Sequence, residues 1–140
     1  MSFRPYLFFG RNCREAFTRY QEIFGGELSI MSSADMPPGE DAPPVEGEWI
    51  MHAALTLGDE LLMGSDDPMS ESFGPVQGMM VVYTAATSEE ANRIFDALSE
   101  GGTVTQPMGP TFFSAAWGMC TDAFGTPWMV DTSEAPSPSA

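Results

Sequence analysis

The spacing of apolar residues in the first half of the chain predicts one helix among four strands. Apolar residues recur every three or four positions over Cys13–Phe24, which predicts an amphipathic helix. Asn12 and Glu15 form a capping-box pattern before it, and Gly25-Gly26 would end it. Shorter apolar or alternating runs predict strands at Arg4–Phe9, Glu27–Ser33, Ile50–Leu57 and Glu60–Gly64.

The second half repeats this order. Thr87 and Glu90 form a second capping box, and an apolar stripe predicts a helix near residues 88–100 that stops at Gly101-Gly102. The predicted strands are Gln77–Ala85, Thr103–Gln106, Ala115–Asp122 and Pro127–Asp131. Setting Gly58 over Gly125 aligns the two closing hairpins. The chain therefore predicts an α+β protein in which one strand–helix–strand–strand–strand module is used twice.

Alternation along the strand 50–57 predicts which residues face a ligand. Trp49, Met51, Ala53, Leu55 and Leu57 form one apolar row that suits packing against a helix. Ile50, His52, Ala54 and Thr56 form a mixed row that suits a cavity. Carrying this register through the repeat places Trp117, Met119 and Thr121 on the same kind of face as His52.

Two proline-rich stretches and the C-terminus predict non-regular structure. The segment Ala34–Gly47 holds four prolines and four acids, so it predicts an acidic loop, either a lid or a plain surface excursion. Asp67–Pro75 predicts the link between the modules. The tail 133–140 predicts disorder.

Charge narrows the classes of partner. The chain has 5 basic and 20 acidic residues, a net charge of −15, which argues against binding nucleic acid or anionic membranes. The charge suits a cationic ligand, or it serves solubility alone. Eleven methionines suit an adaptable apolar cavity or simply fill the core. No membrane span or signal peptide is expected, and Cys13 and Cys120 predict free thiols, so we expect a cytoplasmic protein.

Several stretches resemble a known family over residues 4–132. They are PYLFF, NCREAFTRYQEIFGGEL, IMHAALTLGDELLMGSD, SEEANRIFDALSEGGTV and TFFSAAWGMCTDAFGTPWMVD. In this order they resemble the PhnB-like branch of the vicinal oxygen chelate superfamily, which includes glyoxalase I, dioxygenases and bleomycin-resistance proteins. The resemblance implies a single glyoxalase-like domain over 1–140, with βαβββ modules at 4–66 and 77–132 whose curled mixed sheets surround clefts. It also implies a homodimer.

Catalytic members of that superfamily bind a divalent metal at four positions. Mapped by local pattern, these positions fall here on Pro5, Leu62, Met79 and Met129, with Gln77 close to the third. Such metals need imidazole or carboxylate donors, so the resemblance implies no metal here. Members are sometimes described as demethylubiquinone methyltransferases, but the sequence shows no glycine-rich strand-to-helix turn for a nucleoside cofactor, and we expect no cofactor.

These observations favour a metal-independent small-molecule binding protein, by analogy with bleomycin-resistance proteins, which sequester an antibiotic without chemistry. The ligand would be cationic or aromatic. The predicted ligand-binding residues are His52, Tyr83, Trp117, Met119, Met129, Leu62 and Met79. One alternative is an enzyme that uses His52, with Glu60 as its acid, or an unrecognised metal site. The other is a dimeric interaction module with a vestigial pocket.

Overall fold

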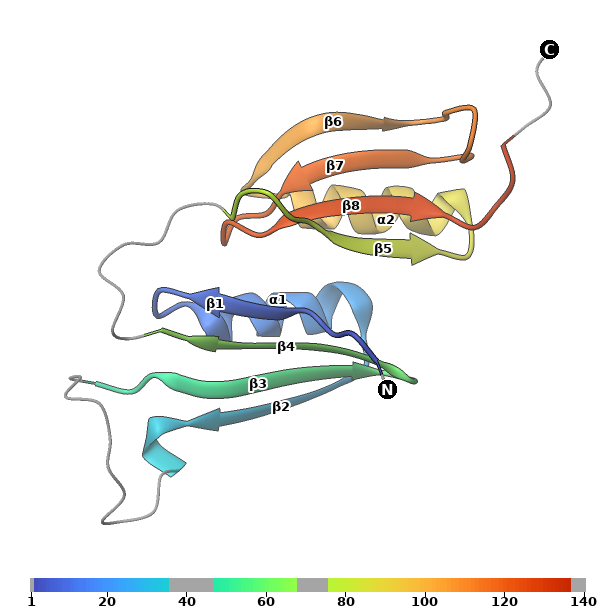
Figure 1. Cartoon of the computed structure of the whole chain (residues 1–140). Coiled ribbons are helices and arrows are strands. Elements are labelled where there is room, and N and C mark those ends of the chain that lie inside the picture. The colour runs from blue at the N-terminus through green and yellow to red at the C-terminus, as the bar shows by residue number, and fades with distance from the viewer. Residues whose placement is uncertain (1, 36–46, 68–75, 137–140) are drawn as a thin grey trace. The chain divides into compact units, whose positions relative to one another are not determined.

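The computed structural model describes residues 2–35, 47–67 and 76–136. The chain forms two compact units, residues 1–73 and 74–140. Each unit holds one α-helix and one four-stranded sheet (Figure 1). The predicted α+β class and the doubled strand–helix–strand–strand–strand order are therefore confirmed. No helix among the described residues is long and apolar enough to cross a membrane.

The first unit runs β1, α1, β2, β3, β4 along the chain. Its elements are β1 (Tyr6–Phe9), α1 (Cys13–Phe24), β2 (Glu27–Ser32), a short 3₁₀ turn (Ser33–Asp35), β3 (Ile50–Leu57) and β4 (Glu60–Asp66). The strands lie in the order β1-β4-β3-β2, with β1 parallel to β4 and the other pairs antiparallel. The sheet is therefore mixed, and the helix has the predicted bounds.

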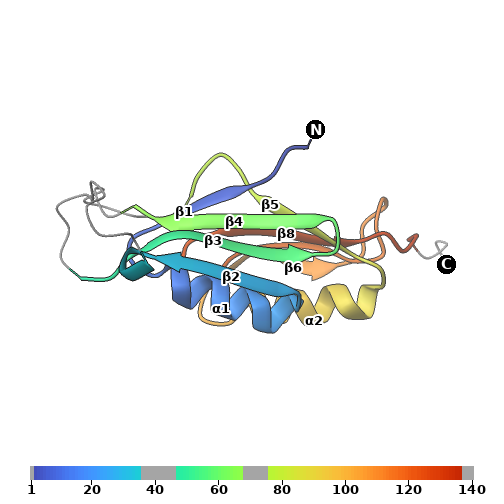
Figure 2. The ribbon, with the colours of Figure 1, turned by 90° about the horizontal axis from the view of Figure 1, so that it is seen from below.

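Helix α1 covers one face of this sheet, as Figure 2 shows. The ring of Phe17 packs edge-on against Phe9 of β1 and against Tyr20. It also approaches Gly64 of β4 so closely that an added Cβ there would lie 2.8 Å from the ring. Ala53 and Leu55, on the predicted apolar row of β3, are buried on this face. The opposite row therefore turns away from α1.

The start of α1 differs from the capping box that the sequence predicts. The side chain of Asn12 makes no capping hydrogen bond. Instead Oδ1 of Asp66, at the end of β4, accepts a hydrogen bond of 3.0 Å from the backbone N–H of Cys13. Its Oδ2 accepts a second one, of 2.9 Å, from the N–H of Ile50. A carboxylate far along the chain has therefore taken the place of the local cap.

The second unit repeats the topology. Its elements are β5 (Val81–Ala85), α2 (Ser88–Ser99), β6 (Thr103–Gly109), β7 (Trp117–Thr121) and β8 (Pro127–Thr132). The strand order is β5-β8-β7-β6, again with one parallel pair, β5 with β8. Strand β5 begins at Val81, four residues after the predicted start. Trp128 and Val130 of β8 and Cys120 of β7 form the buried face.

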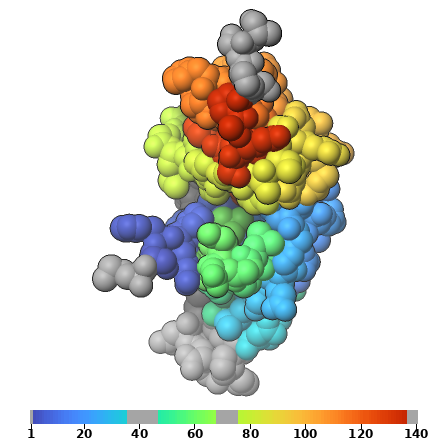
Figure 3. Space-filling view, turned by 90° about the vertical axis from the view of Figure 1, so that its right-hand side faces the viewer, coloured from blue at the N-terminus to red at the C-terminus, as the bar shows by residue number. Residues whose placement is uncertain are grey.

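The start of α2 is fixed largely as predicted. Oγ1 of Thr87 accepts a hydrogen bond of 3.1 Å from the N–H of Glu90, which is half of the predicted capping box. Glu134 adds a carboxylate, which accepts a 2.7 Å hydrogen bond from the N–H of Ser88. This bond lowers the pKa of Glu134, and the segment after β8 lies beside α2 (Figure 3). The predicted disordered tail therefore begins with bonded residues, and 137–140 lie outside the described residues.

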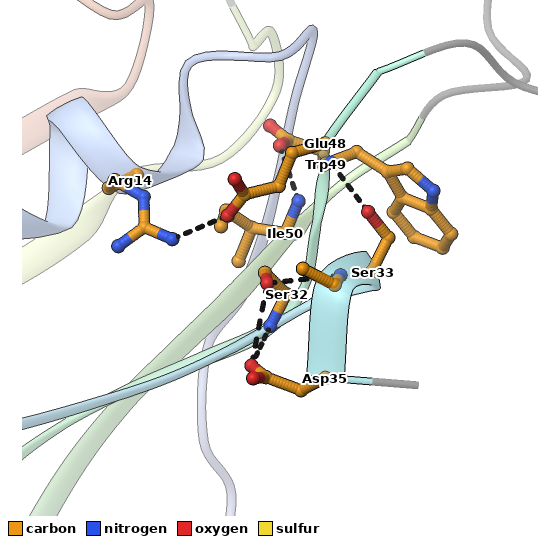
Figure 4. A network of polar contacts seen from close by, with 9 residues as sticks. Arg14, Ser32, Ser33, Asp35, Glu48, Trp49 and Ile50 are labelled. Carbon is orange, nitrogen blue, oxygen red and sulfur yellow. Dashed lines mark hydrogen bonds and ion pairs between the residues drawn. The ribbon is translucent and has the colours of Figure 1, made fainter. Parts of the chain in front are cut away.

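A polar network joins the two segments that flank residues 36–46 (Figure 4). Ser33 and Trp49 exchange two bonds, Ser33 N–H to the Trp49 carbonyl at 2.8 Å and Trp49 N–H to Ser33 Oγ at 3.0 Å. Asp35 accepts from the N–H of Ser32, and Arg14 pairs with Glu48 at 2.8 Å. Most of the predicted acidic loop Ala34–Gly47 lies outside the described residues.

Candidate functional site

Each sheet has one face that turns away from the helix of its own unit, and we call these the first and second open faces. Side chains reach an open face by alternation with the buried residues of the same strand. The first open face carries Tyr6, Phe8, Met31, His52, Ala54 and Met63. The second carries Val82, Thr84, Trp117, Met119, Met129 and Asp131.

The first open face has one hydrogen-bonded polar pair, Tyr6 and His52, among apolar side chains. The hydroxyl of Tyr6 and Nδ1 of His52 are hydrogen-bonded at 3.1 Å, and their rings are 5.7 Å apart. Phe8 lies against Tyr6, with ring centroids 5.2 Å apart, and Met63 pairs directly with Tyr6 across the parallel strands. The only histidine of the sequence thus has a phenol on the same open face as its hydrogen-bond partner. Tyr6 was not among the predicted site residues.

Glu60 is not the partner of His52. It pairs with Leu57 at the hairpin turn, five residues along β3 from His52. At about 3.3 Å per residue this places the two backbones on the order of 16 Å apart. Leu57 also belongs to the row that faces the helix, whereas His52 belongs to the open face. The predicted catalytic pairing of His52 with Glu60 is therefore wrong.

The second open face is aromatic and rich in thioethers. Trp117 of β7 meets the ring of Phe113 edge-on at 6.0 Å, and Phe113 meets Phe112 in the same way at 5.1 Å. Met119 of β7 and Met129 of β8 are direct cross-strand partners. Three of the predicted ligand-binding residues, Trp117, Met119 and Met129, thus lie together on one face.

The structure separates three other predicted ligand-binding residues from these faces. Leu62 is buried on the side of its sheet that α1 covers. Tyr83 alternates with Val82 and lies on the α2 side, where burial and the nearby carboxylate of Glu90 raise its pKa. Met79 precedes β5 and is exposed. The predicted face-sharing of Tyr83 with Trp117 is therefore wrong.

Unequal hairpins explain the displaced position in β4. In the first unit Leu57 pairs with Glu60, which leaves a two-residue turn, whereas in the second Thr121 pairs with Pro127, which leaves five residues. Setting Gly58 over Gly125 therefore shifts β4 by one residue, and a shift of one moves every side chain to the other face. Met63 of β4 lies on the open face beside Tyr6, as Met129 of β8 lies on the open face beside Val82, so we take Met63 as the counterpart of Met129.

Comparison with known proteins places the chain in a family. Residues 1–131 match the family described as 3-demethylubiquinone-9 3-methyltransferase. Protein YjdN of Escherichia coli strain K12 is 31% identical over 141 residues, which cover 94% of this chain and 95% of YjdN. The chain belongs to this family. Its resemblance to the PhnB-like branch, predicted from the sequence stretches, is thereby confirmed.

Solved structures show the same fold. Protein PA1353 from Pseudomonas aeruginosa is 41% identical with a TM-score of 0.82, over 94% of this chain and 97% of that one. A PhnB protein from Bacillus cereus is 23% identical with a TM-score of 0.76, over 95% and 100%. A glyoxalase/bleomycin resistance protein/dioxygenase family enzyme from Burkholderia phytofirmans is 14% identical with a TM-score of 0.59, over 91% and 95%. The 3-demethylubiquinone-9 3-methyltransferase family thus shares the glyoxalase/bleomycin-resistance fold.

The corrected register of β4 shows which side chains occupy the positions at which a divalent metal would be bound. In this member of the 3-demethylubiquinone-9 3-methyltransferase family, the parallel strands place Tyr6 beside Met63 in one unit and Val82 beside Met129 in the other. A phenol, two thioethers and an alkyl group do not form a donor set for a hard divalent metal. Among the described residues, no group of three or more His, Cys, Asp or Glu side chains is placed to hold a metal. The residues at these four positions do not fit such an ion.

The family description names a methyl-transfer activity, but the two strand-to-helix connections β1–α1 and β5–α2 do not have the glycine-rich turn that binds a nucleoside cofactor. Nucleoside cofactors are held where a strand enters a helix through several glycines. Here β1 enters α1 through Gly10-Arg11-Asn12, and β5 enters α2 through Ala86-Thr87. The first connection has one glycine and the second has none, so neither has the several glycines of such a turn.

Proposed function

We propose that this protein is a metal-independent small-molecule binding protein in which a ligand binds on the open face of a sheet. The observation that carries this proposal is the make-up of the second open face, where Trp117, Met119 and Met129 lie together outside the core. Binding sites for small molecules are largely apolar and aromatic with few polar groups. Flexible thioethers adapt to ligands of varied shape.

The first open face favours the same function. Tyr6 and His52 supply one polar pair within a surround of Phe8, Met31 and Met63. Such a pair can fix the orientation of an otherwise apolar ligand. We expect binding without a divalent ion, since neither face offers a hard donor set.

The hydrogen bond between Tyr6 and His52 also favours a second candidate, an enzyme that transfers a proton. A histidine whose Nδ1 is held by a phenol keeps a fixed tautomer and leaves Nε2 for a substrate. Proton-transfer chemistry would then be lost in both His52→Gln and Tyr6→Phe. Plain binding would lose affinity for polar ligands only.

A thermal-shift screen with aromatic and apolar small molecules tests the proposal, since a ligand that binds the folded state at a hundred times its Kd adds about 2.7 kcal/mol. Hits are then measured on Met119→Ala and on a matched control, Val104→Ala, an exposed apolar residue of the adjacent strand β6. We expect Met119→Ala to weaken binding about fivefold or more, about 1 kcal/mol, and Val104→Ala to leave it unchanged. A library without hits, or hits lost after EDTA treatment, would contradict the proposal.

A further inference from the structure

Asp131 introduces a carboxylate into the second open face. It lies on β8, where its cross-strand partners are Trp117 of β7 and Thr84 of β5. Among the described residues, its Oδ1 is the one buried side-chain nitrogen or oxygen that has no hydrogen-bond partner. Sequence reasoning did not single out this residue, because an aspartate at a strand end also suits a plain turn.

The two aspartates of these sheets that are buried as whole residues, Asp66 and Asp122, have hydrogen-bond partners for both carboxylate oxygens. Both oxygens of Asp122 accept hydrogen bonds, from the N–H groups of Phe124 and Thr126 and from the indole of Trp128. Both oxygens of Asp66 accept backbone hydrogen bonds as well. A buried acceptor without a partner costs stability, so each such group in a native protein needs an explanation. Asp131 does not serve the fold in the way that Asp122 and Asp66 do.

No cation within residues 74–140 is placed to compensate this carboxylate. That stretch of sequence holds a single basic residue, Arg93, and no histidine. Arg93 lies on α2, on the opposite side of the sheet, where it is 3.9 Å from Glu90. Residues 74–140 therefore supply no cation to Asp131, and a cationic partner would come from outside them.

We propose that Asp131 and Trp117 form the recognition point for a primary or secondary ammonium group carried on an aromatic or apolar body. An ammonium donates N–H hydrogen bonds that a carboxylate oxygen accepts, and charge assistance strengthens them. The face of an indole attracts the same cation, and Trp provides the strongest such surface among the side chains. Phe113, Met119 and Met129 supply contacts for the body of the ligand. The net charge of −15 would raise the local concentration of such a cation. This inference rests on the proposed binding function and names its ligand class.

Two probes of matched shape separate charge recognition from apolar contact. The first is 2-phenylethylamine, protonated at neutral pH, and the second is 2-phenylethanol, its neutral counterpart. Binding of each is measured by calorimetry and tryptophan fluorescence on the full chain, on Asp131→Asn and on Asp96→Asn. Asp96 is an exposed residue of α2, so its variant reproduces the change in net charge away from the open face. The melting temperature of each variant without a probe is measured in parallel.

We expect the amine to bind the wild-type protein about tenfold or more tightly than the alcohol, with Asp131→Asn removing that preference and Asp96→Asn keeping it. Without a probe, Asp131→Asn should melt no lower than Asp96→Asn, because it removes the charge of a carboxylate whose buried oxygen lacks a partner. Equal affinity of the wild type for both probes would overturn the inference but leave the binding function standing. A preference for the amine that persists in Asp131→Asn would also overturn the inference alone. Unfolding of Asp131→Asn would do the same. Failure of both probes to bind at about 10 mM, together with an empty library screen, would overturn both proposals.

Discussion

The indole Nε1 of Trp128 donates a hydrogen bond of 2.9 Å to Oδ2 of Asp122, and both residues are buried. Trp128 is 2% exposed and lies under α2 on the helix-covered face of its sheet. Oδ1 of Asp122 accepts from the two backbone N–H groups at Phe124 and Thr126. One carboxylate therefore holds the five-residue turn of the second hairpin and fixes the largest side chain of the second core.

Trp128→Phe should destabilise the protein by about 1–3 kcal/mol. The substitution keeps an aromatic ring in the core but leaves Oδ2 of Asp122 buried without a donor, and a buried acceptor that loses its partner costs that much. Urea unfolding followed by circular dichroism gives the free energy. The matched control is Trp117→Phe, on the open face, for which we expect a change within about 0.5 kcal/mol. Equal losses in the two variants would show that the indole hydrogen bond adds nothing.

Asp66→Ala should cost about 2 kcal/mol or more, because both the N–H of Cys13 at the start of α1 and the N–H of Ile50 lose their acceptor. The control is Asn12→Ala. If Asn12 capped the helix, this change would cost about 1 kcal/mol, but its side chain makes no such bond, so we expect less than about 0.5 kcal/mol. Chemical unfolding of both variants decides the matter. A larger loss in Asn12→Ala than in Asp66→Ala would refute the assignment of the cap.

These caps show which features the sequence could and could not predict. Local signals were sufficient for α1, since the apolar spacing and Gly25-Gly26 gave the observed bounds and both glycines adopt positive φ. The cap at Asp66 was not predictable in this way, because it depends on a residue 53 positions from Cys13 that only the sheet brings close. Thr87 caps α2 by accepting a hydrogen bond from Glu90, three residues further along the chain, so this cap could be predicted from the sequence.

The residues of the candidate site also fall into those that local sequence patterns predict and those that depend on contacts in three dimensions. Alternation within one strand placed His52, Trp117 and Met119 on the correct faces, because a strand's period is a local property. Leu62 was displaced because its face depends on the length of the preceding turn, and the two hairpins differ in that length. Tyr6 and Asp131 were missed because their significance comes from a partner, or from the lack of one, in three dimensions.

The thiol of Cys13 should stay protonated in the folded protein well above neutral pH. Burial, with a smaller effect from the carboxylate of Asp66, raises its pKa from 9.0 to about 12. The unfolded thiol ionises first, so this group's contribution to stability is full below pH 9 and is lost as the pH rises toward 12. Between these values it should lower the free energy of unfolding by about 1.4 kcal/mol per pH unit.

Unfolding of the wild type and of Cys13→Ala at a series of pH values above 8 measures this effect as the difference between the two slopes. The comparison is needed because burial also raises the pKa of Cys120, which therefore contributes to both slopes. Folded protein should also resist iodoacetamide at pH 8 and react at both cysteines only in denaturant. Rapid labelling of Cys13 in the native state, or parallel slopes, would contradict the buried environment.

Purified protein should bind its ligand without a divalent ion. Tyr6, Met63, Val82 and Met129 occupy the neighbouring positions of the parallel strand pairs, and these side chains are poor donors for such an ion. Elemental analysis of protein purified without added metal should find well under one zinc, nickel, manganese or iron per chain. The probe affinities should not change after EDTA treatment. One bound ion per chain, together with a loss of binding when it is removed, would show that donors elsewhere complete a metal site.

Trp117→Ala should separate binding from stability. A buried aromatic residue costs about 3–5 kcal/mol when it is replaced by alanine, whereas Trp117 is partly exposed on the second open face, so we expect a loss of less than about 2 kcal/mol. The same variant should lose the fluorescence quenching that 2-phenylethylamine causes, because the indole beside Asp131 is the proposed contact. Trp128→Ala is the matched control, for which we expect the full cost of a core cavity and, where the variant still folds, quenching that persists. If Trp117→Ala were the more destabilised of the two, Trp117 would belong to the core and the second open face would lose its central ligand contact.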